Sequence, residues 1–166
     1  MNHSADNGWY KIGEIARMVD VAVETIRMYE REGILLTEKS TNGQRRFNND
    51  DLNWIRCIRR LIKEQGLNIE GIRRLISLLP CWDLRPCTAA EQRQCPAFLG
   101  ALQPCWTMKE QIPESCRDTN CRQCDVYLSV TRCENLKKVI YRIPAAPQKG
   151  RRQHQSQPIA VEQHQN

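Results

Sequence analysis

The sequence predicts a mainly α-helical protein, with a helical N-terminal domain followed by a small irregular module rich in cysteine. Two observations carry this prediction. Apolar residues recur at helical spacing through most of residues 10–79. Eight of the nine cysteines then lie between Cys81 and Cys133, where prolines interrupt any long helix. We therefore expect a disordered start at 1–9, a first domain at 10–79, the cysteine-rich module at 80–143 and a disordered polar tail at 144–166.

Composition limits the classes to which the chain can belong. Its 166 residues can hold one medium domain or two small ones, and its formal net charge of +6 hints at a polyanionic partner. No stretch approaches the roughly 18 to 20 apolar residues of a membrane span, and the N-terminus lacks the pattern of a secretory signal. A cytoplasmic location is the resulting expectation. In that reducing compartment, nine cysteines indicate metal or redox chemistry rather than a disulfide framework.

Two short helices are expected at the start of the first domain. The stretch "YKIGEIARMV" places Ile12, Ile15 and Val19 on one apolar face. A second stripe follows in "DVAVETIRMYERE", and Gly33 stands where a helix end favours a left-handed residue. Two helices joined by a tight turn are typical of a helix-turn-helix. The polar side chains that face away from the second stripe can meet phosphates or base edges: Thr25, Arg27 and Arg31.

A β-hairpin is expected next, followed by two more helices. Asn42-Gly43 between extended runs predicts the hairpin turn, because both residue types tolerate positive φ. Arg45 and Arg46 then lie just past the turn, as on a wing that grips the DNA backbone; an ordinary solvated hairpin is the alternative. The stretch "FNNDDLNWIRCIRRLIKEQG" reads as a helix capped by Asn48 or Asn49 and ended by Gly66, with Cys57 as a small core residue. A further helix runs from the cap Asn68 to the stop at Pro80.

These elements together resemble a known family. The stretches "IGEIARMVDVAVETIRMYEREGIL", "NGQRRFNNDDLNWIRCIRRL" and "EQGLNIEGIRRLISLL" are similar to the MerR family of winged-helix transcription regulators, most of all to its heat-shock-repressor (HspR) branch. The resemblance implies a homodimer that binds a pseudo-palindromic element in double-stranded promoter DNA, with RNA polymerase as a further partner. It also implies that the helix Ala22–Arg31 enters the major groove.

The resemblance also assigns residues. Those that match the family's DNA-contacting positions are Thr25, Arg27 and Tyr29 on the second helix and Arg45 and Arg46 on the wing. Two departures remove hydroxyls, since Met28 and Phe47 stand where tyrosine is usual. A larger departure follows Pro80, where no sustained heptads predict the long dimerisation helix typical of the family.

The cysteine-rich module contains an internal duplication. Both copies begin Pro-Cys-Trp, at Cys81-Trp82 and Cys105-Trp106, and both end Cys-x-x-aromatic. This pattern partly resembles the small "two-CW" cysteine modules found beside bacterial signalling domains. Cysteines two residues apart, such as Cys121 and Cys124, can present both sulfurs to one metal from a single turn.

A sulfur-only ligand set fits zinc or an iron–sulfur cluster, and we leave the two open. The adjacent aromatic rings could shield such a site from water, and three arginines could offset its negative charge: Arg117, Arg122 and Arg132. The count permits two four-cysteine sites. The tighter set is Cys105, Cys116, Cys121 and Cys124, and the remaining set is Cys81, Cys87, Cys95 and Cys133.

The function that follows is a DNA-binding transcriptional regulator with a metal- or iron–sulfur-binding sensory module. One alternative is a DNA-binding protein whose module is a purely structural zinc or partner-interaction element, and another is a set of inert reduced thiols. A thiol oxidoreductase is disfavoured because Cys121-Arg-Gln-Cys124 lacks a surrounding βαβ pattern. No catalytic triad, phosphate loop or carboxylate pair is apparent, so we expect no enzyme activity.

Overall fold

The computed structural model describes residues 8–85 and 87–132. The expected disordered tail, most of the expected disordered start and Cys133 lie outside the described residues. The described chain is mainly helical with one small antiparallel sheet, as expected for a winged helix-turn-helix. Among the described residues, no helix is both long and apolar enough to cross a lipid bilayer.

The helix-turn-helix is formed by α1 (Ile12–Met18) and α2 (Val23–Arg31). Their apolar stripes face each other and bury Ile15 and Ile26 completely. Gly33 lies one residue beyond the C-cap of α2 and has a φ of 71°, the left-handed conformation that its position predicted. The second helix therefore has the limits expected from the sequence.

The wing is a hairpin within a three-stranded sheet. Strands β2 (Glu38–Lys39) and β3 (Arg45–Phe47) pair antiparallel, with Glu38 opposite Arg46, and Gly43 takes a φ of 74° in the turn. A strand that we did not expect, β1 (Tyr10–Lys11), pairs on the other side of β3, giving the order β1-β3-β2. A strand of two residues is too short to leave an alternating pattern in the sequence.

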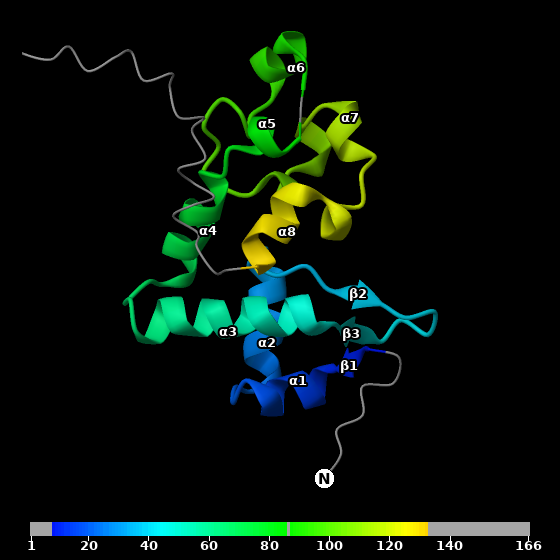
Figure 1. The fold of residues 1–166 in the computed structure, drawn as a ribbon, viewed down its shortest axis with the longest axis vertical. Coiled ribbons are helices and arrows are strands. Elements are labelled where there is room, and N and C mark those ends of the chain that lie inside the picture. Colours follow the sequence, from blue (N-terminus) through cyan, green and yellow to red (C-terminus); the bar gives the residue numbers. More distant parts are fainter. Residues whose placement is uncertain (1–7, 86, 133–166) are drawn as a thin grey trace, which may run out of the picture.

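Two helices complete the first domain. The longest element is α3 (Asn49–Lys63), whose N-cap Asn48 accepts a hydrogen bond from the amide of Asp51. The next helix is α4 (Ile69–Ser77), capped by Asn68 as the sequence predicted. In Figure 1, α3 lies horizontally across the molecule, α2 runs vertically across it and α1 lies below both.

The cysteine-rich segment folds into short pieces stacked on this domain (Figure 1). Its last described helix, α8 (Asp125–Thr131), lies against α3. The other pieces, none longer than six residues, are α5 (Cys81–Leu84), α6 (Ala89–Gln94), η1 (Cys105–Thr107), η2 (Lys109–Gln111), α7 (Glu114–Arg117) and η3 (Cys121–Gln123). The longest helix in the described part of this segment, α8, has seven residues.

One apolar core runs through both parts of the chain. The same cluster of buried residues holds Trp54 of α3, Ile72 of α4, Trp106 of η1 and Tyr127 of α8. Packing is therefore continuous across the expected boundary between residues 79 and 80, and that boundary stays a prediction.

Candidate nucleic-acid interface and thiol cavity

The outer face of α2 carries the expected groove-facing residues. Arg27 is exposed over half of its side chain and lies 3.5 Å from the carboxylate of Glu24. Glu24 also pairs with Arg31 at 2.6 Å, whereas Thr25 is half-buried. These pairs are solvent-exposed and therefore weak, so Arg27 and Arg31 can exchange them for phosphates. Their role in DNA binding remains a prediction.

Tyr29 lies in a different setting from the other expected DNA contacts. The resemblance implies a DNA contact, but only 3% of this residue is exposed, because it points into the core from the inner side of α2. Burial raises the pKa of its phenol. Its remaining surface faces a hollow of about 310 Å³ that is also lined by Thr25, Arg59 and Lys63. Tyr29 therefore packs in the core, and its contact with DNA stays a prediction.

The wing arginines are both held by acidic residues. Arg45 pairs with Glu30 of α2 at 2.5 Å, and Arg46 pairs with Glu38 on the neighbouring strand. The guanidinium of Arg46 also lies 4.4 Å from the centre of the Trp9 ring. Both side chains remain more than one third exposed. Contact with a phosphate would therefore compete with an existing ion pair.

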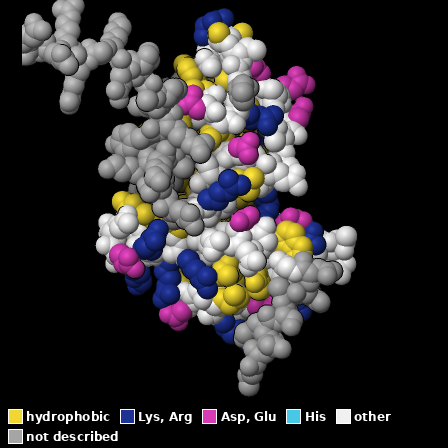
Figure 2. Space-filling view, viewed as in Figure 1, with side chains coloured by type: hydrophobic (Ala, Val, Ile, Leu, Met, Phe, Trp, Pro, Cys, Tyr) yellow, Lys and Arg dark blue, Asp and Glu magenta, His cyan; other side chains and the backbone are white. Residues whose placement is uncertain are grey.

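A second basic surface lies on α3. Figure 2 shows basic side chains gathered where this helix crosses the molecule. Four of them line a surface hollow of about 350 Å³: Arg56, Arg59, Arg60 and Lys63. These residues were not among the predicted DNA contacts, although their spacing in "WIRCIRRLIK" places them on one face of a predicted helix.

Seven free cysteines line one cavity of about 50 Å³ inside the cysteine-rich module. Apolar groups, among them Phe98, Trp106 and Tyr127, complete its wall. Short helices and 3₁₀ turns bring the sulfurs together from across the segment: Cys81, Cys87, Cys95, Cys105, Cys116, Cys121 and Cys124. The described members of both expected four-cysteine sets therefore share a single cavity. Cys57 lies elsewhere, buried on α3, and is not among the free thiols.

Burial controls the protonation of these thiols. Desolvation, reinforced by the neighbouring cysteines, raises the pKa of Cys81 to about 11 and that of Cys105 to about 12. Desolvation also raises the pKa of Cys121, although Lys109 opposes this shift. Without a cation in the cavity, Cys81 and Cys105 are therefore protonated at neutral pH.

The metal donors that line the cavity are cysteine sulfurs. Sulfur donors in this number suit zinc or iron–sulfur centres and do not suit magnesium or calcium. Within residues 8–85 and 87–132, however, no three cysteine, histidine or acidic side chains are arranged to hold a metal ion. The described thiols are therefore of the right type and number to bind a thiophilic metal, but their sulfurs are not arranged in a coordination shell.

The two tryptophans of the duplication differ in role. Trp82 is 39% exposed and packs edge-to-face on Phe98, with ring centres 5.1 Å apart. Trp106 is buried, packs on Tyr127 and donates its indole N–H to the carbonyl oxygen of Gly33 at 2.7 Å. The second copy therefore joins the module to the end of α2.

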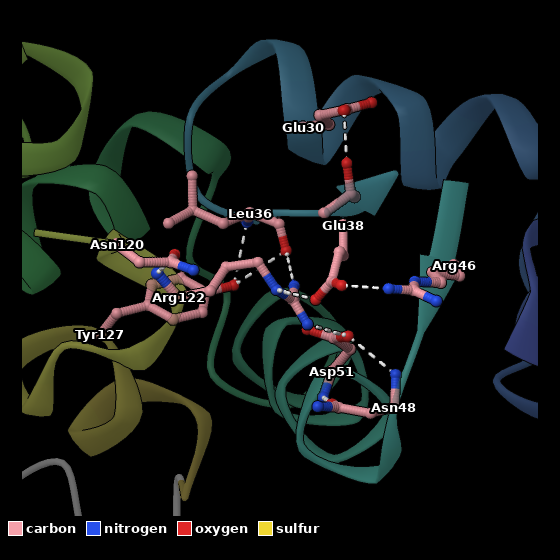
Figure 3. Close-up of polar contacts among 10 residues, drawn as sticks. Glu30, Leu36, Glu38, Arg46, Asn48, Asp51, Asn120, Arg122 and Tyr127 are labelled. Atoms are coloured by element: carbon pink, nitrogen blue, oxygen red, sulfur yellow. Dashed lines mark hydrogen bonds and ion pairs between the residues drawn. The ribbon is translucent and has the colours of Figure 1, made fainter. Parts of the chain in front are cut away.

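Arg122 corrects the expectation that the module's arginines offset the thiolate charge. Its guanidinium turns towards the first domain and forms two parallel hydrogen bonds with Asp51, at 2.9 Å and 2.8 Å (Figure 3). A third bond goes to the carbonyl oxygen of Leu36. Asp51 is 1% exposed, so this is a buried ion pair between the two parts of the chain. Sequence alone offered no sign of it, because the partners are 71 residues apart.

Comparison with known proteins finds similarity that includes the first domain. The profile of the family described as "MerR HTH family regulatory protein" matches residues 10–79. The transcriptional regulator ZntR of Escherichia coli (strain K12) is 27% identical over 128 residues, which cover 73% of this chain and 89% of ZntR. The regulator MlrA of the same strain is 35% identical over 69 residues, covering 41% of this chain and 28% of MlrA.

Two further proteins extend the comparison. HspR of Streptomyces coelicolor, described as a heat shock protein, is 29% identical over 73 residues, covering 44% of this chain and 48% of HspR. The crystal structure of HiNmlR, a MerR family regulator lacking the sensor domain and bound to promoter DNA, is 30% identical. It covers 40% of this chain and 50% of that one, with a TM-score of 0.37.

ZntR and MlrA are described as transcriptional regulators and HiNmlR as a MerR family regulator, whereas HspR is described as a heat shock protein. The similarity to HspR is one of several at comparable identity, so it does not select a branch. Residues 10–79 of this chain are thus similar to the MerR family of helix-turn-helix regulatory proteins, and the similarity to ZntR extends over most of the chain.

Proposed function

We propose that this chain is a cytoplasmic transcription regulator whose thiol cavity binds a thiophilic metal ion or an iron–sulfur cluster and thereby controls binding to promoter DNA. The observation that carries the proposal is the convergence of seven free cysteines on one cavity, in a module packed against the winged helix. Binding to promoter DNA as a homodimer, with RNA polymerase as a further partner, belongs to the same proposal.

The chemistry of the cavity supports a metal or cluster. Such a group supplies the positive charge that lets several buried thiols ionise together. The sulfurs of Cys105, Cys116, Cys121 and Cys124 remain our first candidates for ligands, and those of Cys81, Cys87 and Cys95 adjoin them in the same cavity. Because the sulfurs come from separate short elements, drawing them together would move those elements.

The distribution of charge supports the DNA partner. The chain carries a formal net charge of +6, and exposed arginines stand on α2 and α3. Arginine contacts to phosphates release counterions, so affinity should fall steeply as salt rises. Arg27→Ala should weaken binding and lower the salt dependence by about one released counterion.

The test compares the full-length protein with and without its metal on one DNA duplex. The duplex would be selected from a random pool by the full-length protein, and binding would be followed by fluorescence anisotropy at two salt concentrations. We expect the metal-loaded and chelator-treated proteins to differ in affinity by about 5- to 150-fold, the usual range for coupled sites. Equal affinities of the two folded forms, with the loss of metal verified, would contradict a sensory role.

A structural zinc is the second candidate, favoured by the continuous core. Trp106 and Tyr127 both bond to the backbone of the first domain, at Gly33 and Leu36. If a metal mainly holds this module together, chelation should unfold the module and its contacts with the first domain, rather than change the DNA affinity of a folded protein. Circular dichroism on the same samples separates the candidates, since a structural zinc predicts loss of helix on chelation and a sensory centre does not.

A further inference from the structure

We propose that Arg122 is a positioning residue that couples the state of the thiol cavity to the wing. This inference rests on the proposed function. Arg122 lies in η3, between Cys121 and Cys124, and both of these cysteines line the cavity. Its side chain is nevertheless only 13% exposed, because it points out of the module into the first domain (Figure 3).

The first contact of Arg122 is rigid. Two parallel N–H···O bonds to the carboxylate of Asp51 fix both the distance and the plane of the guanidinium. Asp51 in turn forms a capping box with Asn48 at the start of α3, through bonds of 2.9 Å and 3.0 Å. Arg122 is therefore anchored at the point where β3 ends and α3 begins.

The second contact reaches the wing. The Nε atom of Arg122 lies 3.8 Å from the carboxylate of Glu38, and the other oxygen of that carboxylate pairs with Arg46. Two arginines thus share one acidic group. While Arg122 stays in place, the negative charge of Glu38 attracts both arginines. If Arg122 moves away, Glu38 pairs with Arg46 only and binds it more strongly. Since Arg46 is an expected phosphate contact, the position of Arg122 sets how readily the wing can bind DNA.

The geometry of η3 makes this link sensitive to the cavity. The element is three residues long, and Arg122 directly follows Cys121 in the chain. A shift of the Cys121 or Cys124 sulfur therefore moves the backbone that carries Arg122. The helix that follows, α8, is also held to the first domain: the hydroxyl of its Tyr127 accepts a hydrogen bond at 2.9 Å from the amide of Leu36, two residues before β2. A bidentate ion pair tolerates little displacement. Such a shift would therefore break the contacts of Arg122 with Asp51 and Glu38.

The test is the ratio of DNA affinities between metal-loaded and metal-free protein. The apo-protein would be refilled with Zn²⁺ and, in a parallel sample, reconstituted with ferrous iron and sulfide. We expect the wild-type ratio to lie at about 5- to 150-fold and that of Arg122→Gln to fall to within about twofold, with unchanged metal content. A merely structural role would lower both affinities by the same factor and leave the ratio intact.

Two further variants complete the design. Arg117→Gln removes an equally charged side chain directly after Cys116, but Arg117 is exposed on α7, so its ratio should match the wild type. Because Arg122→Gln leaves Asp51 buried without its partner, the paired change Asp51→Asn with Arg122→Gln keeps the site neutral and foldable. This paired variant should also show a ratio within about twofold.

The outcomes separate the two proposals. If wild-type protein binds metal but its affinity for DNA does not change, the proposed function fails and the coupling fails with it. If the wild type responds and Arg122→Gln or the paired variant responds equally, the coupling alone is overturned. Loss of folding in both the single and the paired variant would also overturn it, because Arg122 would then be a structural requirement and not a transmitter.

Discussion

Trp106 illustrates how a single hydrogen bond can join two parts of this chain. Its indole N–H donates to the carbonyl oxygen of Gly33, whereas Trp82, at the same place in the first Pro-Cys-Trp copy, is exposed and packs only on Phe98. The sequence predicted a duplication but could not distinguish the two copies. Which tryptophan is buried depends on a contact 73 residues away, and no local pattern records such a contact.

The difference between the tryptophans predicts a measurable asymmetry. Trp106→Phe retains an aromatic ring but leaves the carbonyl oxygen of Gly33 without its partner, which should cost about 1–3 kcal/mol of unfolding free energy. The matched change Trp82→Phe should cost less than about 0.5 kcal/mol. Urea unfolding of both variants, followed by far-ultraviolet circular dichroism, measures the two values. Equal losses would show that Trp106 does not secure the module.

At the scale of elements, the end of α2 and the end of η1 approach each other closely. Gly33 has a φ of 71°, and a Cβ atom added there would collide with the methyl group of Thr107. Gly43, in the wing turn, has a similar φ of 74° but open space around it. Substituting each glycine by alanine therefore separates two contributions to the loss of stability: the strain of a left-handed backbone, present at both positions, and the collision with Thr107, present only at Gly33.

This contrast predicts the order of two alanine substitutions. Gly43→Ala should cost roughly 1–2 kcal/mol, the penalty for a left-handed L-residue. Gly33→Ala should cost more, and Thr107→Ser should recover part of the excess, because serine lacks the colliding methyl group. Thermal and denaturant unfolding of the three variants provide the measurement. If Thr107→Ser fails to relieve Gly33→Ala, the close contact between these elements is not what the structure depicts.

The elements differ in how far sequence could predict them. The helices α1 to α4 were expected because each repeats apolar residues with the helical period and carries a recognisable cap or stop, such as Asn68 or Gly66. The strand β1 and the helix α8 were not, since the first is two residues long and the second starts after Cys124 without a capping side chain. Their positions depend on partners supplied by β3 and α3.

At the scale of the whole molecule, the two functional surfaces were not equally predictable. The basic residues of α2 and the wing follow from local spacing, whereas Tyr29 turned out to belong to the core. The cysteines were predicted by count and clustering, but their convergence on one cavity arises from packing between distant short elements. Continuity of the core from Ile72 to Tyr127 then places that cavity against the DNA-binding domain.

The central claim is that this cavity holds a thiophilic metal or cluster, and its most direct test is the metal and acid-labile sulfide content of protein purified without oxygen. Wild-type protein should carry a stoichiometric amount of zinc or of iron with sulfide. Changing Cys121 and Cys124 together to serine should remove about one site per chain, because an oxygen ligand holds either group far less well. Arg117→Gln, an exposed change directly after Cys116, is the control and should leave the content unchanged. Wild-type protein without bound metal, or a double variant with undiminished content, would contradict the account.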